Sequence, residues 1–426
     1  MVAILVLFLV LLFIGVPIAF SLGLASLLYV FFTGTISLNV IAMRMYSGID
    51  DFVLLAIPFF IFAGQLMAKS GITQDLVSLS NLLVGRIRGS LAHVNIVGST
   101  FFAGLTGAAT SDAAAIGGLL IPSMVKEGYD PEYAAAVTAA ASVVGPIIPP
   151  SIVMVIYASI TGESVAALFL GGFIPGFTIC LGLMIVAYVY AVRENHPYRK
   201  HSIPFQVAWR IIGRSSVGLV VPVIILGGIL SGFFTPTESA GIACVYALFI
   251  GVSFFRTLNW SMIRDSLIET VKTTAMVLII ISGARIFGFV LSIEKIPEQV
   301  AAELLRITEN PFILLLIINF FLAIMGTLME PGSNVIILAP ILAPVAAKVG
   351  IDSLHFALIM LVNLNIGMVT PPVGISLFVV SSIARKPFEK IATRAIPFIV
   401  VEFAVLLLLT YIPSVTLFLP KLFGFH

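Results

Sequence analysis

Long apolar runs separated by short polar connectors are the feature of this sequence that most constrains its fold. A helix of roughly 20 apolar residues spans the hydrocarbon core of a bilayer, so each run of that length predicts a membrane-spanning helix. The first run is long enough for two short helices broken near Gly15-Val16-Pro17, because proline removes a backbone donor and clashes with the preceding turn. With that break the sequence predicts about ten spans. The runs lie near residues 2–33, 52–68, 131–161, 165–191, 214–231, 237–255, 270–291, 352–384 and 393–417.

Composition supports this all-α polytopic membrane fold and excludes a soluble one. The 426 residues are 60% hydrophobic and 10% charged, whereas a soluble chain carries roughly 25% charged residues. A net charge of +2 without runs of like charge gives no sign of a nucleic-acid partner, and the expected partner is the lipid bilayer. The five histidines lie in no metal-ligand spacing. Phosphate loops and hydrolase motifs are also absent, so an enzyme is not expected, and any energy that the protein uses must come from an ion gradient.

Two apolar stretches are interrupted midway by small and polar residues. Ala109-Thr110-Ser111-Asp112 interrupts 91–125, and Glu330-Pro331-Gly332-Ser333-Asn334 interrupts 311–345. Each half is judged too short to cross the membrane. We therefore expect two re-entrant helical hairpins, whose irregular backbone is tolerable only where it lines protein or a water cavity.

Lysine and arginine residues predict the orientation of the chain. Placing 193–213 in the cytoplasm and alternating sides assigns sixteen of the 22 to cytoplasmic segments, five to outer segments and Arg285 to the inside of a span. This bias follows the positive-inside rule. Both termini then face outward, with the hairpin at 91–125 entering from inside and that at 311–345 from outside.

The sequence contains an internal repeat. Sliding it by 222 residues aligns Gly104 with Gly326, Lys126 with Lys348 and Pro175 with Pro397 without a gap. This divides the chain into a first copy at 1–192, a cytoplasmic linker at 193–213 and a second copy at 214–426. Because five spans lie in the first half, the copies enter the membrane from opposite sides, which is typical of secondary transporters.

The repeat also duplicates a helix break. Gly145-Pro146-Ile147-Ile148-Pro149-Pro150 interrupts the span at 131–161, and Gly367-Met368-Val369-Thr370-Pro371-Pro372 interrupts the span at 352–384. Each break frees backbone carbonyls near the middle of the membrane. Half-helix C-termini there can coordinate a cation, and N-termini can face an anion.

The hairpin tips and the breaks supply the hard oxygen ligands that a sodium ion prefers. Two such clusters predict at least two sodium ions. Asp112 and Asn334 are the asymmetric pair; Asp112 is expected to serve the ion, with capping of a half-helix as the structural alternative. The candidates are Gly107, Ser111, Asp112, Ser142 and Gly145 in the first copy, and Gly326, Met329, Ser333, Asn334, Gly367 and Thr370 in the second, with Gly and Met acting through their carbonyls.

Arg285 is the candidate for holding a substrate carboxylate through its planar fork of donors. The alternative is that it neutralises Glu330 or Glu238 within the bundle. Glu402 is expected to contact a neighbouring helix or a partner subunit rather than substrate. The other residues expected at the substrate are Ser111, Ser333, Pro149, Pro150, Pro371 and Pro372.

Five segments mix charged residues with large apolar ones at near-helical spacing and predict interfacial amphipathic helices. Ordinary solvated connectors are the alternative for each. The segments are 36–50, 72–90, 193–213, 257–268 and 295–308.

Several motifs resemble those of one transporter family. They are Ala56-Ile57-Pro58-Phe59-Phe60-Ile61-Phe62-Ala63-Gly64, Gly104 through Pro122, Gly145 through Pro150, Thr235-Pro236-Thr237-Glu238-Ser239-Ala240-Gly241 and Gly367 through Pro372. Together these segments resemble the large membrane subunit of tripartite ATP-independent periplasmic (TRAP) transporters, over nearly the whole chain.

The resemblance implies sodium-coupled import of an organic acid, such as sialic acid or a C4-dicarboxylate, across a bacterial inner membrane. It implies two partners, a periplasmic substrate-binding protein and a separate small four-helix membrane subunit, since no such subunit precedes Met1. It also implies an elevator mechanism. Segments 91–161 and 311–384 would carry the substrate past a scaffold formed largely by 2–68 and 214–255.

A looser resemblance links the hairpin tips to divalent-anion/sodium symporters, whose tips carry Ser-Asn-Thr. Here Val335 follows Ser333-Asn334, and Ala113 follows Ser111-Asp112. A self-sufficient sodium/carboxylate symporter therefore stays open as an alternative to the tripartite transporter. An ion channel is a third interpretation, but hairpins within an inverted repeat fit an alternating-access carrier better than a continuous pore.

Overall fold

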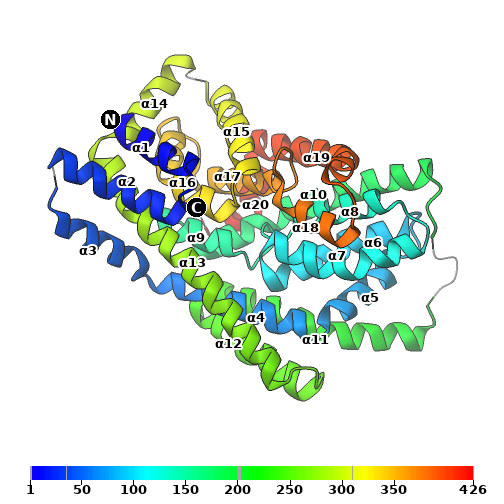
Figure 1. The fold of residues 1–426 in the computed structure, drawn as a ribbon. Helices are drawn as coiled ribbons and strands as arrows, with labels where there is room; N and C mark the ends of the chain where they lie inside the picture. The colour runs from blue at the N-terminus through cyan, green and yellow to red at the C-terminus, as the bar shows by residue number, and fades with distance from the viewer. Residues whose placement is uncertain (1, 35, 199–202, 309, 426) are drawn as a thin grey trace.

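The structure, a computed structural model, describes residues 2–34, 36–198, 203–308 and 310–425. Over these residues the regular structure is entirely helical, as Figure 1 shows. The elements are α1 (Val2–Phe13), α2 (Ile18–Thr33), α3 (Leu38–Ile49), η1 (Phe52–Leu55), α4 (Ala56–Lys69), α5 (Ile72–Val84), α6 (Ser90–Thr106), α7 (Ala109–Lys126), α8 (Pro131–Ser142), α9 (Ile152–Thr161), α10 (Val165–Arg193), α11 (Phe205–Leu230), α12 (Pro236–Phe249), η2 (Ile250–Phe254), α13 (Trp260–Ile293), α14 (Ile296–Ile307), α15 (Pro311–Leu328), α16 (Pro331–Lys348), α17 (Ser353–Gly367), α18 (Ile375–Ala384), α19 (Phe388–Tyr411) and α20 (Pro413–Leu422).

The first apolar run forms two helices, α1 and α2, as the sequence predicts. The chain turns at Gly15, whose φ of 91° lies in the left-handed region that glycine adopts without steric cost. Pro17 follows and starts the second helix with its fixed φ. The two helices pack against each other, and α2 also packs along α13.

Eight helices of the described chain are long and apolar enough to cross a membrane. The remaining predicted spans are the short pair α1 and α2 and the two broken spans. Each broken span consists of two apolar segments of 10 to 15 residues, α8 with α9 and α17 with α18. The chain is therefore a polytopic membrane protein. A count of helices by length misses its broken spans, because each half is short.

The interrupted stretches at 91–125 and 311–345 each form two helices joined by a short tip, α6 with α7 and α15 with α16. The expectation that every half is too short to cross is wrong for α15 and α16, which have 18 residues each. The reason is that the polar insertions belong to helices. Glu330 caps α16 and Pro331 occupies its first position, just as Asp112 lies in the first turn of α7.

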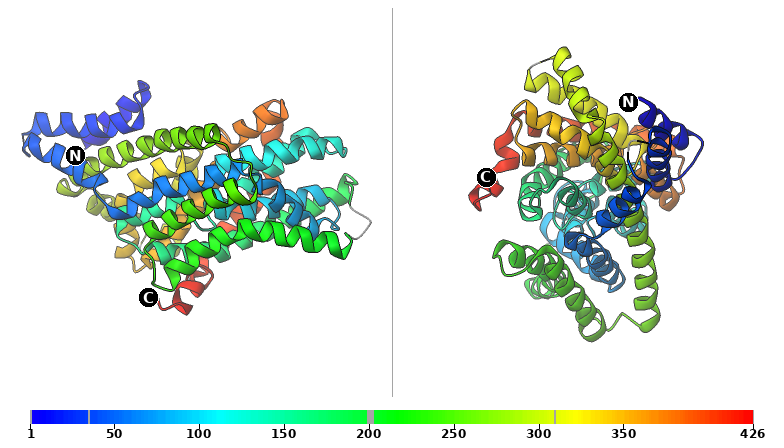
Figure 2. Two further views of the ribbon diagram at one scale, coloured as in Figure 1. Left: turned by 90° about the horizontal axis from the view of Figure 1, so that it is seen from below. Right: turned by 90° about the vertical axis from the view of Figure 1, so that its left-hand side faces the viewer.

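Hairpins and broken helices pack together. α7 lies against α8 and α18, and α16 lies against α9 and α17, so each hairpin contacts both copies of the repeat. In Figure 1 α4, α11 and α12 lie along the lower side of the molecule, below these elements, and α13 crosses diagonally from upper left to the bottom, packing on α4 and α16. Figure 2 shows α13 alongside the blue helices of the N-terminal region, in agreement with its packing on α2 and α3.

A chain of buried polar side chains fastens the second hairpin to the second broken helix. Asn363 of α17 donates through Nδ2 to Oδ1 of Asn319 in α15, and Asn319 Nδ2 donates to Thr410 Oγ1 of α19, each at 2.9 Å. All three side chains are buried. Because unmade hydrogen bonds are costly in the membrane interior, α15, α17 and α19 should move as one body.

Three of the predicted amphipathic segments form separate helices, namely α3, α5 and α14. The segment 257–268 does not, which corrects the prediction. Asn259 caps a helix that starts at Trp260 and continues without interruption to Ile293, because no Gly or Pro separates the charged first turns from the apolar span. The segment 193–213 does not form a separate helix either, because its last part, from Phe205, is the start of the long helix α11. Residues 199–202 of this segment lie outside the described chain.

Ion pairs gather where α10 ends and α19 begins, at the predicted cytoplasmic end of the protein. Arg394 contacts Glu194 at 2.7 Å and Asp130 at 3.0 Å. The end of α10 and the start of α11 lie at the right of Figure 1, whereas both chain termini lie toward the left, as the predicted orientation requires.

Candidate functional site

The tip of the first hairpin rests on the first helix break. Gly107 ends α6 in the left-handed conformation with φ +62°, and a Cβ atom there would lie 2.5 Å from the carbonyl oxygen of Pro150. Only glycine satisfies both the backbone angle and the close approach. The contact brings the tip residues against the freed carbonyls of the break, as the repeat analysis predicts.

Asp112 lies at the centre of this first cluster. Its side chain is fully buried, and Oδ1 accepts a hydrogen bond from the hydroxyl of Thr106. Its other oxygen, Oδ2, has no hydrogen-bond partner among the described residues. A Cβ atom on Gly145 would lie 2.1 Å from that oxygen, so the carboxylate is pressed against the backbone of the break.

Ser142 and Ser111 complete the first cluster in different ways. Ser142 is buried at the C-terminus of α8, where its hydroxyl donates to the Ala139 carbonyl at 2.7 Å and its carbonyl accepts from Gly145 N–H at 3.1 Å. The end of α8 thus presents partial negative charge to the cluster. Ser111 is exposed and faces the space beside the tip.

The second cluster repeats the plan with a tighter backbone contact. A Cβ atom on Gly367 would lie 2.3 Å from the carbonyl carbon of Gly326. Asn334 is fully buried and ties the hairpin arms together, because its Nδ2 donates to the carbonyls of Met325 and Met329 at 3.0 Å each. Its Oδ1 has no partner in the described chain. Thr370 donates its hydroxyl to the Ile366 carbonyl at 2.9 Å.

Two polar residues belong to these clusters although sequence reasoning missed them. Thr106 is the hydroxyl donor to Asp112, and Asn365 is a buried amide whose Oδ1 lacks a partner within the described ranges. The available signal was their spacing, six residues before Asp112 and two before Gly367. Both fall inside helices that end at the cluster, so the search for interruptions passed over them.

A cavity of about 380 Å³ lies between the two tips and the two breaks. Ser111 and Ser333 both face it, which brings together the counterpart serines of the two copies. The expected proline contacts, Pro149, Pro150, Pro371 and Pro372, are not among its described lining residues, whereas Pro146 is. The remaining wall is provided by α13 through Thr273, Met276, Val277 and Ile280.

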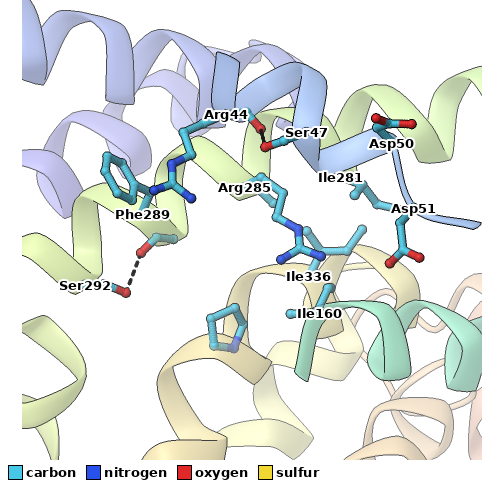
Figure 3. Close-up of a pocket in the computed structure, with 13 residues that line it drawn as sticks. Arg44, Ser47, Asp50, Asp51, Ile160, Ile281, Arg285, Phe289, Ser292 and Ile336 are labelled. Atoms are coloured by element: carbon cyan, nitrogen blue, oxygen red, sulfur yellow. Dashed lines mark hydrogen bonds between the residues drawn. The ribbon is translucent and has the colours of Figure 1, made fainter. Parts of the chain in front are cut away.

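Arg285 lies outside this cavity, in a neighbouring pocket of about 410 Å³ shown in Figure 3. Its Nη2 donates to the Ser159 carbonyl at 2.7 Å. The alternative that Arg285 neutralises Glu330 or Glu238 is not realised. Glu330 accepts from Ser333 N–H, and Glu238 forms a capping box with Thr235.

One face of α13 borders both spaces. Its lining residues follow each other at alternating intervals of three and one, from Thr273 to Ile280 beside the cavity between the two tips, called the tip cavity below, and from Ile281 to Ser292 beside the Arg285 pocket. Such spacing defines a single face of a helix. The two spaces therefore lie in series along α13 and share Ile336 of α16.

Comparison with known proteins decides the family. Residues 5–415 match the family described as "Tripartite ATP-independent periplasmic transporter, DctM component". The chain belongs to this DctM family. A sialic acid TRAP transporter large permease protein of Vibrio cholerae is 41% identical over 97% of this chain and 96% of its own length. A C4-dicarboxylate TRAP transporter large permease protein of Pseudomonas aeruginosa is 39% identical over 95% of this chain and 94% of its own length.

The fold has a counterpart among solved structures. The crystal structure of the YdaH transporter of Alcanivorax borkumensis matches with a TM-score of 0.62, covering 87% of this chain and 86% of the other at 17% identity. At that identity the likeness concerns the fold alone.

Membership of the DctM family confirms the resemblance that the sequence motifs carry. The chain is a membrane component of a tripartite, ATP-independent transporter and lies in the bacterial inner membrane. Its relatives are transporter permeases, which points away from an enzyme. Glu402 is buried in the last long helix, α19, which packs on α8 and α10 of the same chain.

Proposed function

We propose that this DctM-family chain is the large permease subunit of a sodium-coupled transporter that imports an organic acid delivered by a periplasmic binding protein. The single observation that carries sodium coupling is the carboxylate of Asp112. It is fully buried, one of its oxygens lacks a donor in the described chain, and it lies against the break at Gly145. A buried carboxylate of this kind needs a cation or a proton for compensation.

Sodium fits the first cluster because every ligand there is an oxygen. Asp112 supplies charge, Thr106 and Ser142 supply hydroxyls, and the end of α8 supplies carbonyls. The candidate ligands of the second cluster carry no formal charge, although the Glu330 carboxylate caps α16 beside them, and they offer the amide oxygens of Asn334 and Asn365 with the carbonyls of Gly326 and Gly367. Two ions, one at each cluster, are the proposed minimum.

Coupling follows from the position of the ions beneath the hairpin tips. An ion at either cluster draws its tip onto its break and so shapes the cavity that Ser111 and Ser333 face. A substrate that binds the shaped cavity better than the open one gains affinity from sodium, and sodium gains affinity from substrate by the same factor. Carboxylate substrates are proposed because relatives 41% and 39% identical to this chain carry sialic acid and C4-dicarboxylate in their names.

The proposed motion is an elevator. The hairpins and broken helices, fastened by the Asn363, Asn319 and Thr410 contacts, would slide past α4, α11, α12 and α13. The continuous face of α13 supports a sliding motion, since it borders both cavities and offers the tips one surface along its length. The proposed partners are a small four-helix membrane subunit and the periplasmic binding protein, in keeping with the tripartite description of the family.

The test is uptake of labelled sialic acid, and separately of labelled succinate, into liposomes that contain the chain, its small subunit and the neighbouring binding protein. An inward sodium gradient should be required, and Asp112→Asn should abolish the sodium-driven uptake. Uptake without the binding protein would replace the tripartite proposal with a self-sufficient symporter. Uptake independent of sodium, or flux that does not saturate, would overturn sodium coupling.

A further inference from the structure

The pocket around Arg285, here called the outer pocket, is lined by side chains of both charges. It is bounded by α3, α9, α13 and α16 and shares only Ile336 with the tip cavity. Its volume is about 410 Å³, close to the about 380 Å³ of the tip cavity. That size is sufficient for a small organic acid. Its charged lining residues are Arg44, Asp50, Asp51 and Arg285.

Arg44 lies at one end of the outer pocket, and Arg285 lies between Arg44 and the two aspartates. Arg285 uses Nη2 on the Ser159 carbonyl, while its Nε is buried without a partner among the described residues. The Arg44 guanidinium lies 4.1 Å from the ring centroid of Phe289, and Figure 3 shows the two arginines on facing elements. Neither forms a salt bridge within the described ranges. Their remaining donors are available to a carboxylate.

Two carboxylates form the other end. In Figure 3, Asp50 and Asp51 lie on the far side of Arg285 from Arg44 and Phe289. Asp50, the C-cap of α3, follows Arg44 by six positions, which corresponds to roughly 9 Å along the helix axis. Asp51 accepts one hydrogen bond, from Val53 N–H at 3.0 Å, and keeps acceptor capacity on its carboxylate. Carboxylates placed there can accept hydrogen bonds from hydroxyl or amide groups.

The formal charges of these four residues cancel. The outer pocket therefore has little net attraction for small anions in general, and its selectivity rests on orientation. A molecule with one carboxylate and several hydroxyls can place its charge on the arginines and its hydroxyls on the aspartates. A dicarboxylate would bring its second negative charge against Asp50 and Asp51, which is unfavourable.

We propose that the outer pocket is a second substrate site, which holds a hydroxylated monocarboxylate, of the sugar-acid class, before it moves along α13 to the tip cavity. This inference rests on the proposed function and narrows its substrate class. Its position agrees with such a role, because Arg44 belongs to a segment predicted to face outward and the same face of α13 continues into the tip cavity. Sodium is not needed at this site, since its positive charges are fixed.

The test is equilibrium binding of labelled sialic acid to the purified full-length chain, with and without sodium. The wild type should show a sodium-free component that excess unlabelled sialic acid displaces and excess succinate does not. Arg44→Gln and Arg285→Gln should each weaken that component about tenfold or more. Arg306→Gln is the matched control, because Arg306 is exposed, pairs with Glu303 and does not line the outer pocket.

Asp112→Asn separates this inference from the proposed function. It should remove the sodium-dependent component and leave the sodium-free one intact. If the wild type shows the sodium-free component but no sodium-dependent component, the result contradicts the proposed function and leaves the outer-pocket inference standing. The inference is overturned if the wild type binds no sialic acid without sodium, if succinate displaces it equally well, or if Arg44→Gln and Arg285→Gln bind like Arg306→Gln. Size-exclusion profiles and Arg285→Lys, which keeps the charge, exclude misfolding as the cause of a loss.

Discussion

At the scale of single residues, one atom distinguishes the two hairpin tips. Asn334 carries an amide nitrogen that donates to the Met325 and Met329 carbonyls, so its tip closes on itself. Asp112 occupies the counterpart position and has an oxygen instead, which carbonyls would repel. Under the proposed function, the first tip is therefore expected to depend more on its bound cation than the second, whose amide already bridges the hairpin arms.

The close contact between Gly145 and Asp112 can be tested with a single substitution. In Gly145→Ala the new methyl group would lie 2.1 Å from Asp112 Oδ2 and displace the carboxylate from the cluster. Sodium-driven uptake should fall by about tenfold or more, because the site loses its geometry. Gly118→Ala on α7 is the control, since a Cβ atom there meets nothing within 4 Å. Equal uptake by the two variants would contradict the account.

Asn334→Ala tests the closure of the second tip. The substitution removes two hydrogen bonds and deprives the Met329 carbonyl of its Asn334 donor, whereas the Met325 carbonyl keeps the Met329 N–H at 3.2 Å. The free energy of unfolding should fall by about 1–3 kcal/mol. Thermal unfolding in detergent measures this, with Ser333→Ala as comparison because the described Ser333 contact to Glu330 uses its backbone N–H. A fall no larger than that of Ser333→Ala would show that the amide does not close the tip.

At the scale of elements, the sequence predicted hairpins and breaks well because glycine and proline mark them. Gly107 and Gly367 stand where backbones touch, and Gly145 stands against the Asp112 carboxylate, so a larger residue does not fit at any of the three. Boundaries without such markers were missed, as in α13, where the charged first turns run into the apolar span. The partners of buried polar groups were also missed. Thr106 and Asn365 meet their clusters only through tertiary packing, which local periodicity does not contain.

The ion pairs of Arg394 join α8, α10 and α19 at the predicted cytoplasmic end. Arg394 is 38% exposed, so solvent weakens these pairs. Arg394→Met should lower the free energy of unfolding by about 1 kcal/mol and leave the sodium dependence of uptake unchanged. Chemical unfolding combined with uptake assays checks both statements. A shift in sodium affinity would mean that these pairs influence the distant tips.

His196, in the connector after α10, gives a pH dependence to the same region. Burial lowers the pKa of His196 below its ordinary value, partly offset by Glu194. Its contribution to stability is therefore present above the unfolded pKa of about 6.5 and is lost as pH falls through the lower folded pKa. Unfolding temperatures should decline less in His196→Phe than in wild type between about pH 7.5 and about pH 5.5, because Phe has no group to protonate. Phe is chosen because it keeps the ring packing on Tyr129 and Tyr133. Parallel declines would refute this assignment.

At the scale of the whole molecule, the proposal requires the hairpins to move relative to α13. Ser111 on the first tip and Thr273 on α13 face the same two cavities. In a chain with Cys180 and Cys244 replaced, cysteines at Ser111 and Thr273 joined by a short reducible thiol reagent should stop uptake, and reduction should restore it. Each single cysteine treated with the reagent is the control. Full uptake by the cross-linked protein would exclude the sliding motion.

The central claim is that the clusters at the hairpin tips bind sodium, and equilibrium binding of radioactive sodium to the purified chain tests it most directly. We predict saturable binding of at least two ions per wild-type chain, with Asp112→Asn binding one fewer. Gly145→Ala should resemble Asp112→Asn, and Gly118→Ala should resemble wild type. Absence of saturable binding, or equal binding by wild type and Asp112→Asn, would contradict the claim.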